Sequence, residues 1–181
     1  MRVLLDACVL FPTVLREILL GAGEAGLFQP LWSDRILQEW ARAVAAKLPD
    51  QTDIARAEIA LLRTRWPGAM VVPEPLIETG LYLPDPNDVH VLAVAIGAAA
   101  DTLVTFNLKD FPTRTLAAHG ILRRDPDGFL VDLWQDHPDA IAEICERVCL
   151  QADRLSPDGQ TVPGLLKRAR LPRLRKALDR R

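Results

Sequence analysis

Apolar residues occur along the chain as short runs and as helical repeats, and the two patterns alternate. Short runs rich in valine, leucine and isoleucine predict strands, and apolar residues three and four positions apart predict helices. The predicted strands cover residues 3–10, 70–75, 101–107 and a short stretch near 121, with an extended link at 27–33. The predicted helices cover residues 13–26, a segment from Ser33 or Asp34 to just before Pro49, residues 52–65, the stretch from Asp88 onward, and the chain from Gly128 except for an interruption at 156–163.

This alternation of strands and helices predicts an α/β fold with a parallel sheet. In such sheets, ligands bind at the carboxyl ends of the strands. Polar residues gather at the ends of the predicted strands in this chain. We therefore expect a functional site at that edge of the sheet.

The composition is that of a folded domain: 49% of the 181 residues are apolar and 25% are charged. No apolar run approaches the roughly 20 residues that a membrane-spanning helix needs, and Met1 leads directly into a strand rather than a cleavable signal segment. The three cysteines are widely spaced and odd in number, so they predict no disulfide framework. We expect a soluble cytoplasmic protein with no membrane contact.

Charge is distributed unevenly along the chain. Residues 163–181 contain eight lysines and arginines and one acid, a net charge of +7, whereas the remainder carries −9. A basic end on an acidic body favours contact with nucleic acid or an acidic partner, and the alternative is a solvated helix face with a fraying end. If the tail contacts RNA, its deletion should weaken RNA binding and flatten the salt dependence of that binding.

Asp6 ends the first predicted strand within an apolar run. A buried ionised carboxylate is costly unless something pairs with it, and neither Ala7 nor Cys8 carries a positive charge. Other oxygen donors fall at strand ends, at a helix start or on an apolar helix face: Glu39, Asp88, Asn107 and Asp110. A set of oxygen donors without imidazole or thiolate suits Mg²⁺ or Mn²⁺. We therefore expect a divalent ion to be the partner of Asp6.

The residues around these acids resemble PIN-domain nucleases, and especially the VapC-like toxins of toxin–antitoxin systems. The matching motifs are LLDACVL, WSDRILQEW, PDPNDVHVLAVAI and LVTFNLKDFP. They follow one another in the family's order over roughly residues 2–125. The resemblance implies a three-layer α/β fold with a central parallel sheet flanked by helices. It also implies a ribonuclease in which Asp6, Glu39 and Asp88 surround one or two Mg²⁺ or Mn²⁺ ions.

The family pattern of the fourth motif has Thr, one residue, then Asp or Asn, and often Asp-Phe after it. Here these positions are Thr105, Asn107 and Asp110-Phe111, so the neutral amide takes the nearer position. We expect Asp110 to supply the fourth charge, with the carbonyl oxygen of Asn107 beside it. If Asp110 points outward, the site holds three acids and one tight ion. The motifs divide the chain into a PIN-like nuclease domain at 1–128 and a helical C-terminal extension with a basic tail at 129–181.

Other residues near the motifs are candidates for supporting roles. Asp85 is predicted to be a turn or cap residue, with a site role as the alternative, and the Ser33 and Thr105 hydroxyls either bond locally or touch the site. His90 is two residues past Asp88, so a helix turns the two side chains apart, and we expect a packing or surface residue rather than a general base. The candidate phosphate contacts are Arg16, Lys109 and Arg114.

The resemblance implies three partners: RNA, a small antitoxin protein that covers the acidic pocket, and a second copy of the chain in a homodimer. The alternative function is an inactive PIN-like module that binds RNA or serves as a scaffold, which the neutral Asn107 leaves open. A haloacid-dehalogenase-type phosphotransferase is disfavoured, because Cys8 stands where that family has a second aspartate.

Two further motifs carry no predicted chemistry. GAGEAG at 21–26 matches a dinucleotide-binding pattern but follows a helical stretch instead of a strand, so we interpret it as a helix end and turn. Cys145 and Cys149 lie four residues apart without a second pair at zinc-like spacing, and we expect two semi-buried helix cysteines.

Overall fold

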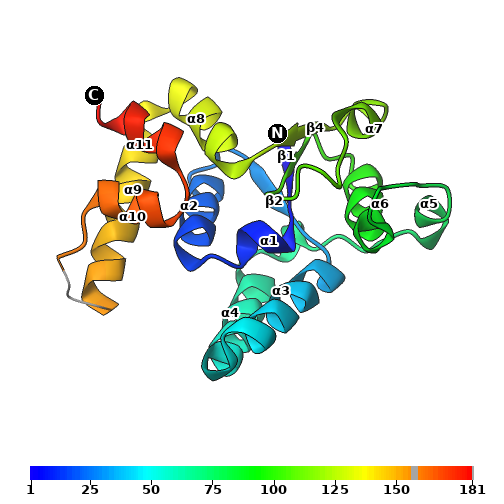
Figure 1. The fold of residues 1–181 in the computed structure, drawn as a ribbon, viewed down its shortest axis with the longest axis horizontal. Coiled ribbons are helices and arrows are strands. Elements are labelled where there is room, and N and C mark those ends of the chain that lie inside the picture. The colour runs from blue at the N-terminus through cyan, green and yellow to red at the C-terminus, as the bar shows by residue number, and fades with distance from the viewer. Residues whose placement is uncertain (156–158, 181) are drawn as a thin grey trace. The chain divides into compact units, whose positions relative to one another are not determined.

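Four short strands form the sheet of the first of two units into which the chain divides (Figure 1). In this computed structural model, residues 1–155 and 159–180 are described. The first unit consists of residues 1–11 and 29–123, and the second of residues 12–28 and 124–181. Part of the predicted interruption at 156–163 and the last residue of the basic tail lie outside the described residues.

The sheet runs in the order β2-β1-β3-β4. Its strands are β1 (Arg2–Leu5), β2 (Gln29–Leu31), β3 (Thr102–Val104) and β4 (Leu122–Arg124). Strand β1 pairs in parallel with both β2 and β3, with Leu4 opposite Leu31 on one side and Leu103 on the other. The chain goes from β1 to β2 on one side of the sheet and later to β3 on the other. The carboxyl ends of β1 and β3 are therefore the switch point where α/β sheets bind ligands.

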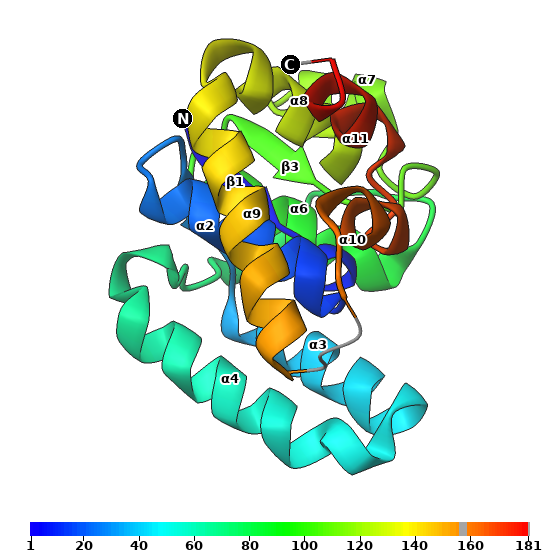
Figure 2. The same ribbon diagram turned by 90° about the vertical axis from the view of Figure 1, so that its left-hand side faces the viewer.

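Helices of the first unit connect these strands. They are α1 (Ala7–Leu10), α3 (Asp34–Lys47), α4 (Thr52–Arg65), α5 (Pro75–Glu78), α6 (Val89–Gly97) and α7 (Thr113–Ala117), with single 3-10 turns at Pro49–Gln51, Pro67–Ala69 and Pro86–Asp88. Ser33 caps α3 by accepting a hydrogen bond from Ile36 N at 3.3 Å. Helices α3 and α4 lie side by side in both views (Figures 1 and 2).

The second unit contains five helices in its described residues. They are α2 (Thr13–Glu24), α8 (Pro126–Asp136), α9 (Pro138–Leu155), α10 (Val162–Arg168) and α11 (Pro172–Leu178). Helix α2 packs against α9 (Figure 2). The contact is close at Gly21, where an added Cβ would lie 2.9 Å from the Ile144 side chain. The GAGEAG segment thus ends a helix, as predicted, and turns at Gly26 with φ of +75°.

The basic tail is helical and anchored by its own unit. The Asp127 carboxylate accepts hydrogen bonds from the first backbone amides of α11, Arg173 N at 2.9 Å and Leu174 N at 3.0 Å. The Arg173 side chain pairs with both Asp125 and Asp127. Burial alone would raise the pKa of Asp125, but the hydrogen bonds from Arg173 and Gly128 N outweigh burial and lower it.

Two predicted strands are wrong in their boundaries. The run at 3–10 is a strand only to Leu5, because Val9 N and Leu10 N bond back to Asp6 O and start a helical turn. The predicted strand at 70–75 is reduced to one bridge between Met70 and Trp32. The second strand of the sheet lies instead at Gln29–Leu31, within the predicted extended link.

The predicted fold class is confirmed: a parallel sheet flanked by helices is followed by a helical C-terminal part. The division of the chain at residue 128 stays a prediction. All three cysteines are free, and Cys145 and Cys149 are buried in α9. Among the described residues, none of the helices combines the length and apolarity that a membrane crossing requires.

Candidate metal centre

Asp6 and Thr105 meet where β1 and β3 end side by side. Asp6 follows β1 directly, and its backbone N–H bonds to Val104 O at 3.2 Å. The Thr105 hydroxyl, which is fully buried, lies 2.6 Å from Asp6 Oδ2 and donates to it, since a carboxylate oxygen can only accept. Asp6 occupies the N-cap position of α1 without a side-chain cap bond. Its carboxylate is therefore oriented by Thr105, which follows β3, and not by a capping bond to a backbone amide of α1.

The Cys8 thiol is a second donor to Asp6. Cys8 Sγ lies 3.1 Å from Asp6 Oδ2 and accepts from Phe106 N at 3.2 Å. Burial, reinforced by the charge of Asp6, raises the pKa of Cys8 to about 12. The thiol therefore keeps its proton and its donor role at neutral pH. The sequence interpretation used Cys8 only to disfavour another family and did not predict this contact.

Asp85, Asp88 and Asp110 form the closest group of carboxylates. One oxygen of each lies within 4.8 Å of the others, and all three side chains are half-buried. Asp88 stands at the N-cap of α6 but makes no cap bond. Asp85 does act as a cap, as predicted, by accepting from Asn87 N at 2.9 Å. Asp85 is therefore both a local cap and a member of the three-carboxylate group, which the sequence left as alternatives.

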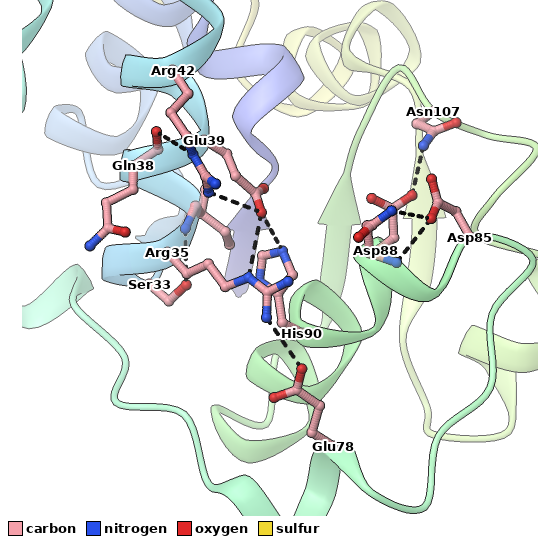
Figure 3. Close-up of polar contacts among 12 residues, drawn as sticks. Ser33, Arg35, Gln38, Glu39, Arg42, Glu78, Asp85, Asp88, His90 and Asn107 are labelled. Carbon is pink, nitrogen blue, oxygen red and sulfur yellow. Dashed lines mark hydrogen bonds and ion pairs between the residues drawn. The ribbon is translucent and has the colours of Figure 1, made fainter.

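Asn107 links Asp6 and Thr105 to the group of Asp85, Asp88 and Asp110, and its contact with Asp88 is drawn in Figure 3. Its side-chain amide donates to Asp88 Oδ2 at 2.8 Å, and its backbone N–H donates to Thr105 Oγ1 at 2.9 Å. The loop after β3 thus orients Asp6 through Thr105 and Asp88 through Asn107. Both Asn107 and Asp110 lie beside Asp88, so the fourth motif contributes an amide as well as a charge.

Negative charge accumulates around Asp88. Burial and the charges of Asp6, Asp85, Asp110 and Glu39, in that order, raise the pKa of Asp88 to about 6. Carboxylates that repel one another in this way would be stabilised by a bound divalent cation. The oxygen-only donor set of Asp85, Asp88 and Asp110 fits Mg²⁺ or Mn²⁺.

The stability of the metal-free protein should reflect this shift. An acid whose pKa is raised in the folded state is more easily protonated there than in the unfolded chain. The stability that it contributes to the fold is therefore present below the ordinary pKa and is lost as pH rises through the folded pKa. The free energy of unfolding should therefore fall through the interval from 3.8 to about 6 on account of Asp88. Thermal unfolding in chelator should show Asp88→Asn gaining stability over wild type as pH rises through this interval. A constant difference between the two proteins would contradict the shift.

Glu39 lies apart from the three-carboxylate group. On α3, its Oε1 is 2.8 Å from His90 Nε2, 3.6 Å from Arg35 Nε and 3.9 Å from Arg42 Nη2 (Figure 3). His90 is buried, as a packing residue would be, but it faces a predicted site residue. The spacing from Asp88 gave no indication of this contact, because the partner of His90 comes from another helix.

The remaining candidates are scattered. Ser33 is buried and engaged as the cap of α3. The Lys109 side chain is 85% exposed, 3.7 Å from Asp110, and Arg114 is exposed on α7. Arg16 belongs to the second unit, where it is buried 3.9 Å from Glu17. The phosphate-binding roles of these three cations stay predictions.

A family model described as PIN domain matches residues 2–109, which is more than half of the chain. The chain belongs to the PIN-domain family. PIN domains are generally nucleases, act on RNA and typically bind divalent metals. The match includes Asp6, Glu39, Asp85 and Asp88 and ends one residue before Asp110. Searches among curated proteins and among solved structures gave no significant match.

Proposed function

We propose that this PIN-domain protein is a Mg²⁺- or Mn²⁺-dependent endoribonuclease and the toxin of a toxin–antitoxin pair. The observation that carries the nuclease proposal is the group of Asp85, Asp88 and Asp110, with Asp6 close enough to raise the pKa of Asp88. The four sequence motifs, in their VapC-like order, support the toxin role.

The protein's own residues prepare this site before any ligand arrives. Thr105 and Cys8 fix the Asp6 carboxylate, and Asn107 fixes that of Asp88. Side chains held in this way lose little freedom when a ligand binds, which favours both affinity and a defined geometry. The residues we propose to hold the ion are Asp6, Glu39, Asp85, Asp88 and Asp110.

The charge of the site constrains its substrate. A phosphodiester is anionic and would be repelled by a group of uncompensated carboxylates. With a divalent ion held by these carboxylates, the repulsion would be offset and a water of lowered pKa would be available for hydrolysis at phosphorus. We propose that Lys109, exposed beside Asp110, meets a phosphate of the RNA strand.

The proposal extends to the setting of the protein. We infer a cytoplasmic nuclease that acts on RNA and is held inactive by a small antitoxin protein covering the acids. We also infer a homodimer. Both inferences are supported by the motif resemblance rather than by a contact in the structure.

The test is cleavage of a mixed RNA pool by the full chain with Mn²⁺, with Mg²⁺ and with EDTA. We expect cleavage with metal and none in EDTA, and a higher melting temperature with metal, since a ligand that binds the folded state stabilises it. Cleavage that persists in EDTA would contradict the proposal. Metal-independent RNA binding without cleavage would favour the inactive binding module instead.

A further inference from the structure

His90 Nε2, at the start of α6, lies 2.8 Å from Glu39 Oε1, in the middle of α3 (Figure 3). We propose that His90 is a positioning residue that fixes where the Glu39 carboxylate lies relative to the carboxylates of the metal centre. This inference rests on the proposed function, because it gives His90 a role in binding the same divalent ion.

The His90–Glu39 contact matters because the His90 side chain is buried. His90 is only 2% exposed, and its ring nitrogens make no directed hydrogen bond to any described residue. A buried polar group without compensation costs free energy, so the nearby Glu39 oxygen at 2.8 Å matters to the ring. A carboxylate only accepts, so His90 would have to carry its proton on Nε2 to donate to Glu39 across this distance.

The two arginines beside Glu39 are less able to set its position. Arg35 and Arg42 are both exposed and lie farther from the carboxylate than His90 does. Arg35 is also shared with Glu78, 3.4 Å away. Exposed ion pairs are screened by solvent and contribute little. The buried imidazole is therefore the nearest of the three groups to Glu39 and the one shielded from solvent.

His90 connects Glu39 to the start of α6, the same helix start that carries Asp88. Asp88 stands at the N-cap of α6, and His90 is the second residue of that helix. One rigid helix start thus carries both a carboxylate of the three-acid group and the ring that contacts Glu39. Glu39 is also close enough to contribute to the raised pKa of Asp88. A shift of the ring would therefore move Glu39 relative to Asp88.

The experiment measures Mn²⁺ affinity of the full chain by calorimetry at one pH, with thermal unfolding as a check on folding. His90→Leu removes the polar ring, His90→Asn keeps a polar group too short to reach Glu39, and His90→Gln keeps a donor of similar reach. We expect His90→Leu and His90→Asn to weaken Mn²⁺ binding about tenfold, as loss of an outer-shell partner does. His90→Gln should recover most of the affinity.

The decisive arm is the double variant His90→Leu/Glu39→Gln. If His90 acts through Glu39, the double variant should bind Mn²⁺ no more weakly than Glu39→Gln alone. Additive losses, or unchanged affinity in both His90→Leu and His90→Asn, would overturn the proposal. If His90→Leu fails to fold, the contrast between His90→Asn and His90→Gln decides in its place. His119→Leu, a change at an exposed histidine, is the matched control.

Failure of the proposed function is separately visible. Wild type that binds no Mn²⁺, or binds it equally after Asp88→Asn, would overturn the metal centre and the role of His90 together. Mn²⁺ binding that depends on Asp88 but is unchanged in the His90 variants would overturn the role of His90 alone.

Discussion

Replacing Asp88 with asparagine should lower metal-dependent RNA cleavage by at least about a hundredfold, the upper range for loss of a mere outer-shell partner, while the fold remains intact. Asparagine has nearly the same shape but no charge, so the three-acid group loses one of its anions. The same change removes the cost of burying a charge and the repulsion from neighbouring acids, which together raise the pKa of Asp88. The metal-free variant should therefore melt at a higher temperature than wild type at neutral pH.

This combination of lower activity and higher stability separates a site residue from a structural one. The measurements are RNA cleavage with Mn²⁺ and melting temperature with Mn²⁺ and with chelator. Asp53→Asn, at a carboxylate that is 94% exposed on α4, makes the same charge change as a control. Induced expression in bacterial cells extends the test to the toxin role: wild type should arrest growth and Asp88→Asn should not. Full cleavage by Asp88→Asn would show that these acids do not form the active site.

Helices were the most predictable part of the fold. Ser33, one of the two predicted starting residues, caps α3, and Pro49 and Pro67 bound α4 through single 3-10 turns. Local chemistry determines such ends: a hydroxyl satisfies a free amide, and a proline disfavours continuation of the preceding helix. The sequence therefore contains within a few residues what is needed to predict these helices.

Strands were less predictable because pairing depends on distant residues. Gln29–Leu31 contains Pro30, a residue disfavoured inside a sheet, yet β2 lies at the edge of the sheet, where a proline is tolerated. The run at 70–75 has the valines of a strand but also two prolines, and only Met70 pairs. The short apolar run after Asp6 could not be distinguished from a helical turn by periodicity alone.

The sequence pointed to candidate residues where an acid follows a strand or lies in a motif, as Asp6 and Asp88 do, and their roles stay predictions. The contacts of Cys8, Asp85 and His90 were missed or left open for a common physical reason. Each depends on where a side chain points across elements, which spacing along one element does not determine. The signals available in the sequence were the Cys8 position two residues after Asp6 and the repeated aspartates of the PDPND segment.

Deleting residues 163–181 should unfold the second unit rather than merely remove charge. Four leucines of this segment are fully buried: Leu165, Leu166, Leu171 and Leu174. Truncating one buried leucine to alanine costs about 2–5 kcal/mol, and a whole domain is stable by only about 5–15 kcal/mol. Helix α11 also packs against α8 and is held by Asp127. Hydrogen exchange should show α8 and α9 losing protection in the truncated chain, and retained protection there would contradict this expectation.

Charge substitutions on the intact helices therefore test RNA contact better than deletion does. The exposed cations of α10, α11 and their flanks are Lys167, Arg168, Arg170, Arg173, Lys176 and Arg180. Arg168 and Arg173 are left unchanged, because Arg168 donates to Gln160 and Arg173 pairs with Asp125 and Asp127. Replacing the other four with glutamine should weaken binding of single-stranded RNA. The slope of log affinity against log salt should flatten by about 0.7 for each RNA phosphate that the variant no longer neutralises.

The control removes four exposed cations elsewhere, at Arg2, Lys47, Arg56 and Arg154. If the basic tail is an RNA-binding surface, the control should leave the salt slope nearly unchanged while the tail variant flattens it. Equal flattening in both proteins would show that net charge alone attracts RNA, since a general field acts irrespective of where the cations lie. An unchanged slope in the tail variant would mean that α10 and α11 serve only to complete the packing of the second unit.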